Sequence, residues 1–206
     1  MTDKEQLAEL NIEQIRRDFP VLKRTVGNDK PLVYLDNAAT SQTPVQVIAE
    51  ITRFYRDHNA NIHRGVHTLS VESTELYEGA RNTIAEFLGA PSASECIFTR
   101  NTTESINLVA SAWGKSNLEE GDEIVISEIE HHSNIVPWQI IRDELNVSLR
   151  FIPMLTDGSL DVDAAAEIIG PRTKLVAITA MANSLGNITP LADIIEMAKK
   201  LSLIHI

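Results

Sequence analysis

Three apolar stretches of the sequence are each followed by polar side chains that could bind a ligand or move a proton. These polar groups are Thr102 and Thr103, then His131 to Asn134, and then Asn183 and Ser184. If the stretches are parallel strands, all three deliver their polar residues to one edge of the same sheet. Ligands bind beyond the carboxyl ends of the strands in open sheets of that kind. The spacing therefore predicts one shared site.

Thr102 and Thr103 open a segment with helical spacing. The first amides of a helix lack intrahelical partners, and the helix dipole favours negative charge there, so this turn could bind a phosphate. The alternative is that a threonine only caps the helix, with Glu104 as an ordinary acid of the first turn. The sequence alone leaves both interpretations open.

His131 and His132 also allow more than one interpretation. Both could be exposed loop residues, or one ring could lie flat against a planar ligand whose phosphate binds near Thr102. A planar ring with a phosphate arm suggests pyridoxal phosphate.

A metal site has weaker support. His63 and His67 have the spacing of a helical zinc pair, but Gly65 between them indicates a loop, and the glutamate of an H-E-x-x-H motif is absent. Adjacent histidines in one turn, as at 131 and 132, point apart. We therefore predict no metal ligands.

Stretches typical of strands alternate along the sequence with stretches typical of helices, and these elements must position the polar residues. Short, β-branched apolar stretches typical of buried strands occur at 31–36, 95–99, 123–128, 149–154 and 174–180. Segments with helical spacing occur at 5–20, 43–58, 73–90, 103–114, 133–145 and 190–201. This alternation predicts an α/β fold with a mostly parallel sheet flanked by helices.

Composition limits the function. The chain has 206 residues, of which 43% are hydrophobic, enough for a packed core. Its formal net charge of -11 and the lack of a basic cluster argue against nucleic-acid binding. No stretch approaches the roughly 20 apolar residues of a membrane span, and the charged start of the chain is unlike a signal peptide, so we expect a cytoplasmic protein. The single cysteine, Cys96, permits no internal disulfide, and we expect it to pack in a core.

Several motifs together resemble the N-terminal half of SufS-type cysteine desulfurases, a class V aminotransferase group of the fold-type I pyridoxal-phosphate enzymes. They are "RRDFPVL", "YLDNAATSQTP", "NIHRGVHTLS", "RNTTESINLVASAWG", "EIEHHSNIVPWQ" and "ANSLGNITPL", in this order between residues 16 and about 201. The resemblance implies that residues 31–201 are an incomplete large domain that binds pyridoxal phosphate. Residues 1–30 would be an N-terminal helical segment and 202–206 a tail of doubtful origin.

The resemblance also implies roles for particular residues. Thr102 and Thr103 would bind the cofactor phosphate, His131 would stack on its ring, and Asn183 would lie near its phenolic oxygen and the substrate carboxylate. Asn37, Ala38 and Arg64 would contribute to substrate binding.

In the complete enzyme the resemblance implies transfer of sulfur from L-cysteine to an enzyme persulfide, with release of L-alanine, for iron–sulfur cluster assembly. Its implied partners are a second copy in a homodimer and a sulfur acceptor of the SufE or SufU kind. The family's cofactor-binding lysine and nucleophilic cysteine have no counterpart here, and Cys96 is in the wrong place. We therefore expect a truncated, inactive chain. Another fold-type I activity, such as an aminotransferase or a kynureninase-like lyase, and a non-catalytic module remain as alternatives.

Overall fold

The computed structural model describes residues 11–201 and 203, which form two compact units. The first unit ends at Ile97 and the second begins at Phe98. The expected boundary at residue 30 is a boundary between domains, whereas the boundary at residue 97 separates two compact units. The predicted domain organisation therefore stays a prediction. The expected tail, 202–206, lies outside the described residues except for Leu203.

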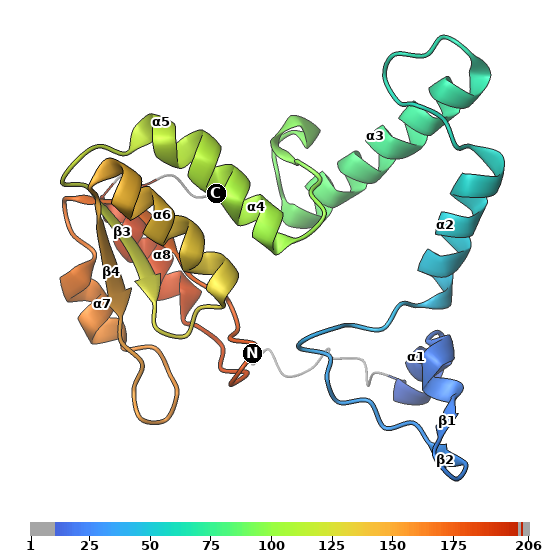
Figure 1. Ribbon diagram of the computed structural model, residues 1–206, viewed down its shortest axis with the longest axis horizontal. Coiled ribbons are helices and arrows are strands. Elements are labelled where there is room, and N and C mark those ends of the chain that lie inside the picture. Colours follow the sequence, from blue (N-terminus) through green and yellow to red (C-terminus); the bar gives the residue numbers. More distant parts are fainter. Residues whose placement is uncertain (1–10, 202, 204–206) are drawn as a thin grey trace, which may run out of the picture. The chain divides into compact units, whose positions relative to one another are not determined.

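The first unit is built from helices, turns and one short hairpin (Figure 1). Its elements are α1 (Ile12–Arg17), a 3-10 turn (Pro20–Lys23), β1 (Thr25–Val26), β2 (Lys30–Pro31), α2 (Val45–Asp57), α3 (Thr68–Leu88) and a second 3-10 turn (Ala93–Glu95). The helices predicted at 43–58 and 73–90 are confirmed as α2 and α3. Gly89 ends α3 in the left-handed region, with φ of 68°, as its place after the helix suggested. The helix predicted at 5–20 is described only from residue 11, and there α1 begins after Asn11, whose side chain accepts a hydrogen bond from the amide of Gln14.

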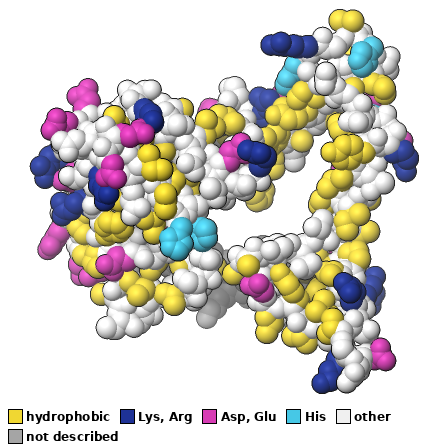
Figure 2. Space-filling model, in the orientation of Figure 1, with side chains coloured by type: hydrophobic (Ala, Val, Ile, Leu, Met, Phe, Trp, Pro, Cys, Tyr) yellow, Lys and Arg dark blue, Asp and Glu magenta, His cyan; other side chains and the backbone are white. Residues whose placement is uncertain are grey.

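The first unit buries few side chains. Only Ser70, Ser73 and Ala85 are buried among its described residues. Apolar side chains are exposed along α2, as Figure 2 shows: Val45, Val47, Ile48, Ile51 and Tyr55. An exposed apolar face of this extent is typical of an interaction surface.

The second unit alternates strands and helices. Its elements are α4 (Thr102–Val109), a π-helical stretch (Ala110–Gly114), α5 (Lys115–Asn117), β3 (Glu123–Ser127), a 3-10 turn termed η4 (His132–Asn134), α6 (Val136–Leu145), β4 (Ser148–Ile152), α7 (Val162–Ile168), β5 (Thr173–Ala177) and α8 (Leu191–Lys200). The sequence predictions missed α7, although Asp161 gives its start by accepting a hydrogen bond from the Ala164 amide.

The strands of the second unit form a parallel sheet in the order β4-β3-β5. The central strand β3 is buried along its whole length. This confirms the three predicted strands at 123–128, 149–154 and 174–180, and with them the α/β fold class.

Two predicted strands are wrong. The stretch 31–36 contributes only β2, which pairs antiparallel with β1 through a tight turn at 27–29. The stretch 95–99 begins in a 3-10 turn and then runs without regular structure. A strand requires a hydrogen-bonded neighbour, and no described strand pairs with 95–99. Cys96 is correspondingly only half-buried, so its predicted core position is also wrong.

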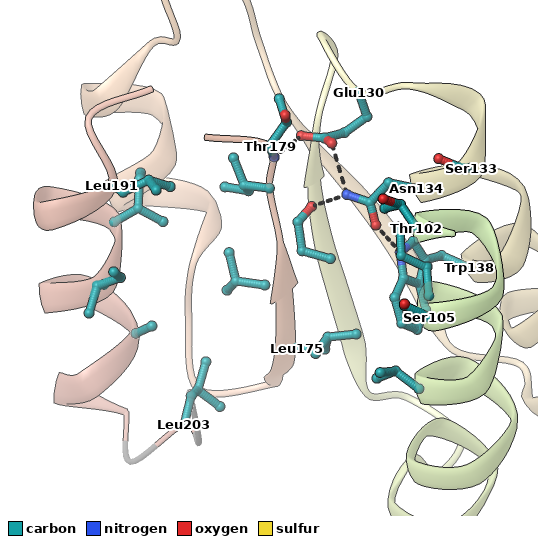
Figure 3. A pocket seen from close by; sticks show the side chains of 18 of the residues that line it. Thr102, Ser105, Glu130, Ser133, Asn134, Trp138, Leu175, Thr179, Leu191 and Leu203 are labelled. Atoms are coloured by element: carbon teal, nitrogen blue, oxygen red, sulfur yellow. Dashed lines mark hydrogen bonds between the residues drawn. The ribbon is translucent and has the colours of Figure 1, made fainter. Parts of the chain in front are cut away.

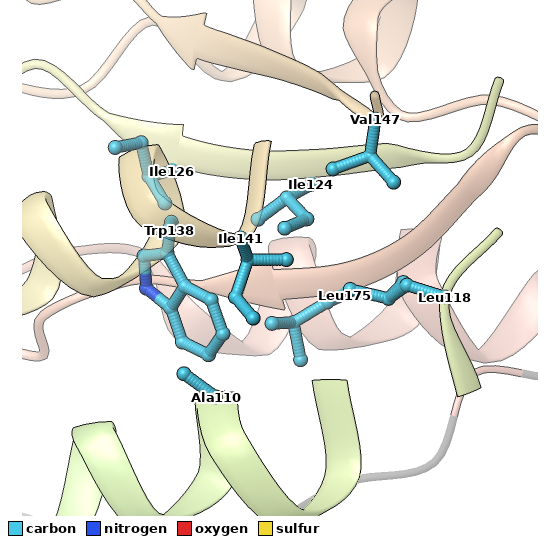
Figure 4. Packing of buried hydrophobic residues seen from close by; sticks show 8 residues of the cluster. All are labelled: Ala110, Leu118, Ile124, Ile126, Trp138, Ile141, Val147 and Leu175. Atoms are coloured by element: carbon cyan, nitrogen blue, oxygen red, sulfur yellow. The ribbon is translucent and has the colours of Figure 1, made fainter. Parts of the chain in front are cut away.

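Each face of this sheet has its own hydrophobic core. On one face, Ile124 and Ile126 of β3 pack with the helices before and after that strand (Figure 4). The whole cluster is Ala110, Leu118, Ile124, Ile126, Trp138, Ile141, Val147 and Leu175. On the other face, Val125 packs with α7 and α8. Successive side chains of a strand point to opposite faces, so β3 anchors both cores.

No helix among the described residues has both the length and the apolar character needed to cross a membrane.

Two neighbouring isoleucines of α6 test the assignment of the core. The side chain of Ile141 is 1% exposed and that of Ile140 is 48% exposed. We expect Ile141→Ala to lower the free energy of unfolding by about 2–5 kcal/mol, because it leaves a cavity beside Trp138. Ile140→Ala should change it by under about 1 kcal/mol. Urea unfolding followed by tryptophan fluorescence measures both, and equal losses would show that α6 does not pack as described.

Candidate functional site

A cavity of about 460 Å³ in the second unit begins at the carboxyl end of the sheet (Figure 3). Polar side chains line this end: Thr102, Ser105, Glu130, His131, Ser133, Asn134 and Thr179. The other end is apolar and extends along β5 between α4 and α8. The structure thus brings Thr102 and His131 together, as the sequence predicted.

The N-terminal end of α4 is capped by Asn101. Its side-chain oxygen accepts a hydrogen bond of 2.9 Å from the amide of Glu104. The Glu104 carboxylate in turn accepts hydrogen bonds from the backbone amide and the guanidinium of Arg100, which lower the pKa of Glu104 below its usual value. Capping therefore does not occupy the threonines, which removes the alternative interpretation of their role.

Thr102 and Thr103 are the first two residues of α4. Their amides have no carbonyl four residues earlier within the helix, so they can donate to a ligand. Neither hydroxyl forms a hydrogen bond with another described residue. Thr102 lines the cavity, whereas Thr103 does not. This turn has the donors that an anion requires.

Glu130 joins the carboxyl ends of β3 and β5. One carboxylate oxygen accepts hydrogen bonds from the Ser127 hydroxyl, at 2.5 Å, and from the Thr179 amide, at 2.8 Å. The other accepts one from the Asn134 side chain at 2.8 Å. The carboxylate therefore holds two strands and the intervening turn in one arrangement.

Asn134 extends this network to the core. Its amide nitrogen also donates to the Ala177 carbonyl at 3.1 Å, and its oxygen accepts from the Trp138 indole at 2.9 Å. Trp138 is almost completely buried. The turn that carries the histidines is thus bonded to the hydrophobic core of the unit.

His131 is oriented by its own turn. Its Nδ1 accepts a hydrogen bond of 3.1 Å from the Ser133 amide and lies 2.9 Å from the Ser133 hydroxyl. A neutral ring that accepts at Nδ1 carries its proton at Nε2. His132 lies outside the cavity lining, with its ring centroid 6.1 Å from that of His131. Of the two histidines, His131 is placed to contact a ligand.

Asn183 lies in an exposed turn after β5 and does not line the cavity. The turn is closed by a hydrogen bond from the Gly186 amide to the Ala182 carbonyl. It packs on a neighbouring turn at Gly158, where an added Cβ would lie 2.7 Å from the Asn187 side-chain nitrogen. Gly158 also has a φ of +86°, so both the steric contact and the backbone conformation disfavour a side chain there. The role of Asn183 stays a prediction.

The remaining predicted residues belong to the first unit. Asn37 and Ala38 lie in a turn in which the Asp36 carbonyl accepts from the Thr40 amide. Arg64 is exposed. Their predicted part in substrate binding is not tested by the geometry of the second unit.

The histidines of "HRGVH" have local partners. His63 contacts the Glu78 carboxylate at 2.6 Å, while His67 precedes α3 and accepts a hydrogen bond from the Ser70 amide. In the part of the chain that the structure describes, no group of three histidine, cysteine, aspartate or glutamate residues could hold a metal ion.

The sequence predictions did not include three of the polar residues that line the polar end of the cavity, Ser105, Glu130 and Thr179. Thr179 was included in the strand predicted at 174–180. A signal was present, because a glutamate at a strand end with asparagine four residues later can bond across one turn. Lys174 and Lys199 also line the cavity, near its apolar end.

Glu130→Gln tests the network. The new amide group would place its own N–H groups against a donor, either the Asn134 side chain or the Thr179 amide. We expect a loss of about 1–3 kcal/mol in unfolding free energy, since a partly buried donor is left unpaired. Urea unfolding measures this loss. Glu119→Gln, at an exposed position, should stay within about 0.5 kcal/mol, and equal effects would exclude a special role for Glu130.

Comparison with known proteins supports one family. The model of the aminotransferase class-V family matches residues 33–206. A cysteine desulfurase of Klebsiella pneumoniae is 51% identical over 188 residues, covering 91% of this chain and 46% of that protein. A probable cysteine desulfurase of Mycolicibacterium paratuberculosis is 48% identical, covering 92% of this chain and 28% of its own length.

Solved structures agree with this result. An apo cysteine desulfurase from Thermococcus onnurineus has a TM-score of 0.84 and 38% identity, covering 93% of this chain and 46% of that one. The cysteine desulfurase CsdA of Escherichia coli has a TM-score of 0.80 and 35% identity, covering 94% and 47%. The chain therefore spans less than half the length of these relatives, has the fold-type I architecture over that part, and belongs to the aminotransferase class-V family.

Proposed function

We propose that this chain is the cofactor-binding part of a SufS-type cysteine desulfurase, which takes sulfur from L-cysteine and releases L-alanine. The relatives at 48–51% identity support the activity. The motifs around His63 and His131 support the SufS type. The observation that carries the proposal is the start of α4, where neither threonine hydroxyl is engaged and Thr102 lines the same cavity end as the oriented ring of His131.

The residues of this end fit pyridoxal phosphate. First-turn amides and the hydroxyls of Thr102 and Thr103 can bind a phosphate. The His131 ring can lie against a planar ring, because its Nδ1 is already bonded within its own turn. The cavity of about 460 Å³ is in the size range of small-molecule sites.

Particular residues would then have distinct tasks. The threonine turn would fix the phosphate, His131 would orient the ring and carry a proton at Nε2, and Glu130 would hold His131 in place. When bound, the cofactor would act as the electron sink of the reaction. Asn183, Asn37, Ala38 and Arg64 remain the proposed contacts of the substrate.

The wider setting is proposed on the same basis. The complete protein would act in the cytoplasm as a homodimer, pass sulfur to an acceptor of the SufE or SufU kind and serve iron–sulfur cluster assembly. The exposed apolar side chains along α2 support an interface with a second chain.

Replacing both threonines tests the phosphate site. We expect Thr102→Val with Thr103→Val to weaken pyridoxal phosphate binding by the whole chain about tenfold, or about 1.4 kcal/mol, because two hydroxyl donors are lost. Fluorescence titration with the cofactor measures the affinity. Thr83→Val, at an exposed position of α3, is the matched control. Equal affinities in all three proteins would mean that the threonines do not bind the phosphate.

A chimera tests the activity. Residues 33–201 would replace the corresponding part of the Klebsiella pneumoniae relative, so that its second half completes the protein. We expect alanine and persulfide from L-cysteine. A folded chimera that binds the cofactor but yields no alanine would contradict the desulfurase proposal and favour an aminotransferase or a kynureninase-like lyase.

Histidine variants of the same chimera separate the two neighbours. His131→Ala should shift the absorption of the bound cofactor and slow turnover about tenfold or more, because ring contact and proton transfer are lost. His132→Ala should have the smaller effect, since its side chain lies outside the cavity lining. The reverse order would exclude His131 as the stacking residue.

A further inference from the structure

The chain leaves β5 at its carboxyl end and turns back on itself before α8. Residues 179–189 form a short antiparallel hairpin there, in which Met181 is bridged to Ile188. We call this segment the β5 hairpin. It lies on the side of the sheet where ligands of open parallel sheets bind, and its tip carries Asn183.

A buried threonine fastens the base of the β5 hairpin. The hydroxyl of Thr189 donates a hydrogen bond of 2.7 Å to the Thr179 carbonyl, and its amide donates one of 2.9 Å to the Ala180 carbonyl. Thr189 is only 5% exposed, so water competes little for the bond of its hydroxyl. This bond joins the last residue of the hairpin to its first.

Thr179 connects the hairpin to the polar end of the cavity. Its amide donates to the Glu130 carboxylate at 2.8 Å (Figure 3), and its hydroxyl donates to the Met181 carbonyl at 3.0 Å. Because its carbonyl accepts from Thr189, the amide, hydroxyl and carbonyl of Thr179 are all engaged. Two hydrogen bonds in series thus join the base of the hairpin to the carboxylate that precedes His131.

The tip of the hairpin has a weaker attachment. The Asn187 side chain donates to the Asp157 carbonyl of the neighbouring turn at 3.4 Å. This contact is exposed and longer than the usual N–H···O distance. The short, buried bond of Thr189 therefore contributes more to the orientation of the hairpin than the contact at its tip.

We propose that Thr189 is a positioning residue for the substrate, because its hydroxyl holds the β5 hairpin in one orientation and so fixes Asn183 relative to His131. The inference rests on the proposed function, in which Asn183 contacts the substrate. Thr189 itself touches no reacting atom and acts through Asn183. Removing its hydroxyl leaves the hydrogen bonds of His131 unchanged, so substrate binding is affected more than the chemical step.

Hydrogen exchange of the whole chain without cofactor tests the anchoring. Thr189→Val keeps the shape of the side chain and removes its hydroxyl. We expect the Ala182 and Gly186 amides, both bonded within the hairpin, to exchange about fivefold faster, the factor expected for the loss of one ordinary hydrogen bond. Thr189→Ser, which keeps the hydroxyl, should restore the original rates.

Thr156→Val is the matched control, because Thr156 is exposed in the neighbouring turn. It should leave the exchange of the hairpin amides unchanged. Equal rates in the original chain and in Thr189→Val would overturn the proposal. Faster exchange in β3 as well would show a global loss of stability and would also overturn it.

The chimera with the second half of the Klebsiella pneumoniae relative tests the effect on the substrate. We expect Thr189→Val to raise KM for L-cysteine about fivefold and to change kcat less than about twofold, because a contact with the bound substrate is misplaced. Thr189→Ser should restore KM. A lower kcat with an unchanged KM would contradict a positioning role.

A double substitution tests whether Thr189 acts through Asn183. In a chimera that already carries Asn183→Ala, Thr189→Val should raise KM no further, because residues that act through one contact are not additive. Additive effects would overturn the proposed route.

The two measurements also separate this inference from the proposed function. An original chimera that forms no alanine contradicts the desulfurase proposal and with it the substrate role of Thr189. Hydrogen exchange needs neither cofactor nor substrate, so it still decides whether Thr189 anchors the hairpin. Changed exchange with an unchanged KM in an active chimera would overturn the positioning role alone.

Discussion

The site depends on the hydrogen bonds that the Glu130 carboxylate accepts. Parallel strands end at one edge without any covalent link there, so the loops beyond them need a fixed connection. Glu130 supplies it by bonding to Ser127 at the end of β3, to Thr179 beyond β5 and to Asn134 in η4. A carboxylate with several donors is stable in a partly buried place where an unpaired one would not be. The position of His131 follows from this arrangement.

The central strand shows which part of the fold could be predicted from sequence. Its residues are apolar and β-branched, bury both faces and need no information from distant parts of the chain. The same holds for α2, α3 and α8, whose helical spacing is regular. Gly89 also indicated where α3 ends. For these elements, patterns of burial and local backbone geometry were sufficient.

Other features depend on partners that a local pattern does not contain. The stretch 95–99 looks like a strand but has no described neighbour to pair with, and the stretch 31–36 forms only a short hairpin with β1. Thr102 looked like a cap, but Asn101, one residue earlier, has that role. Glu130 has only one local signal, Asn134 four residues later, and its bond to Thr179, 49 residues away in sequence, has none. Residue type predicted Thr102 and His131, and geometry was needed for Glu130 and Thr179.

The two ends of the cavity are formed by different interactions. At the polar end, hydrogen bonds within the second unit orient His131 and leave the Thr102 hydroxyl available to a ligand. At the apolar end, α4 and α8 supply the walls. The residues expected to contact the substrate, Asn37 and Arg64, belong instead to the first unit, which buries few of its described side chains. Since burial of apolar surface is the main source of stability, the cofactor end should stay formed under conditions that already disorder the first unit. Cofactor binding and substrate binding would then be lost at different denaturant concentrations, the substrate contacts first.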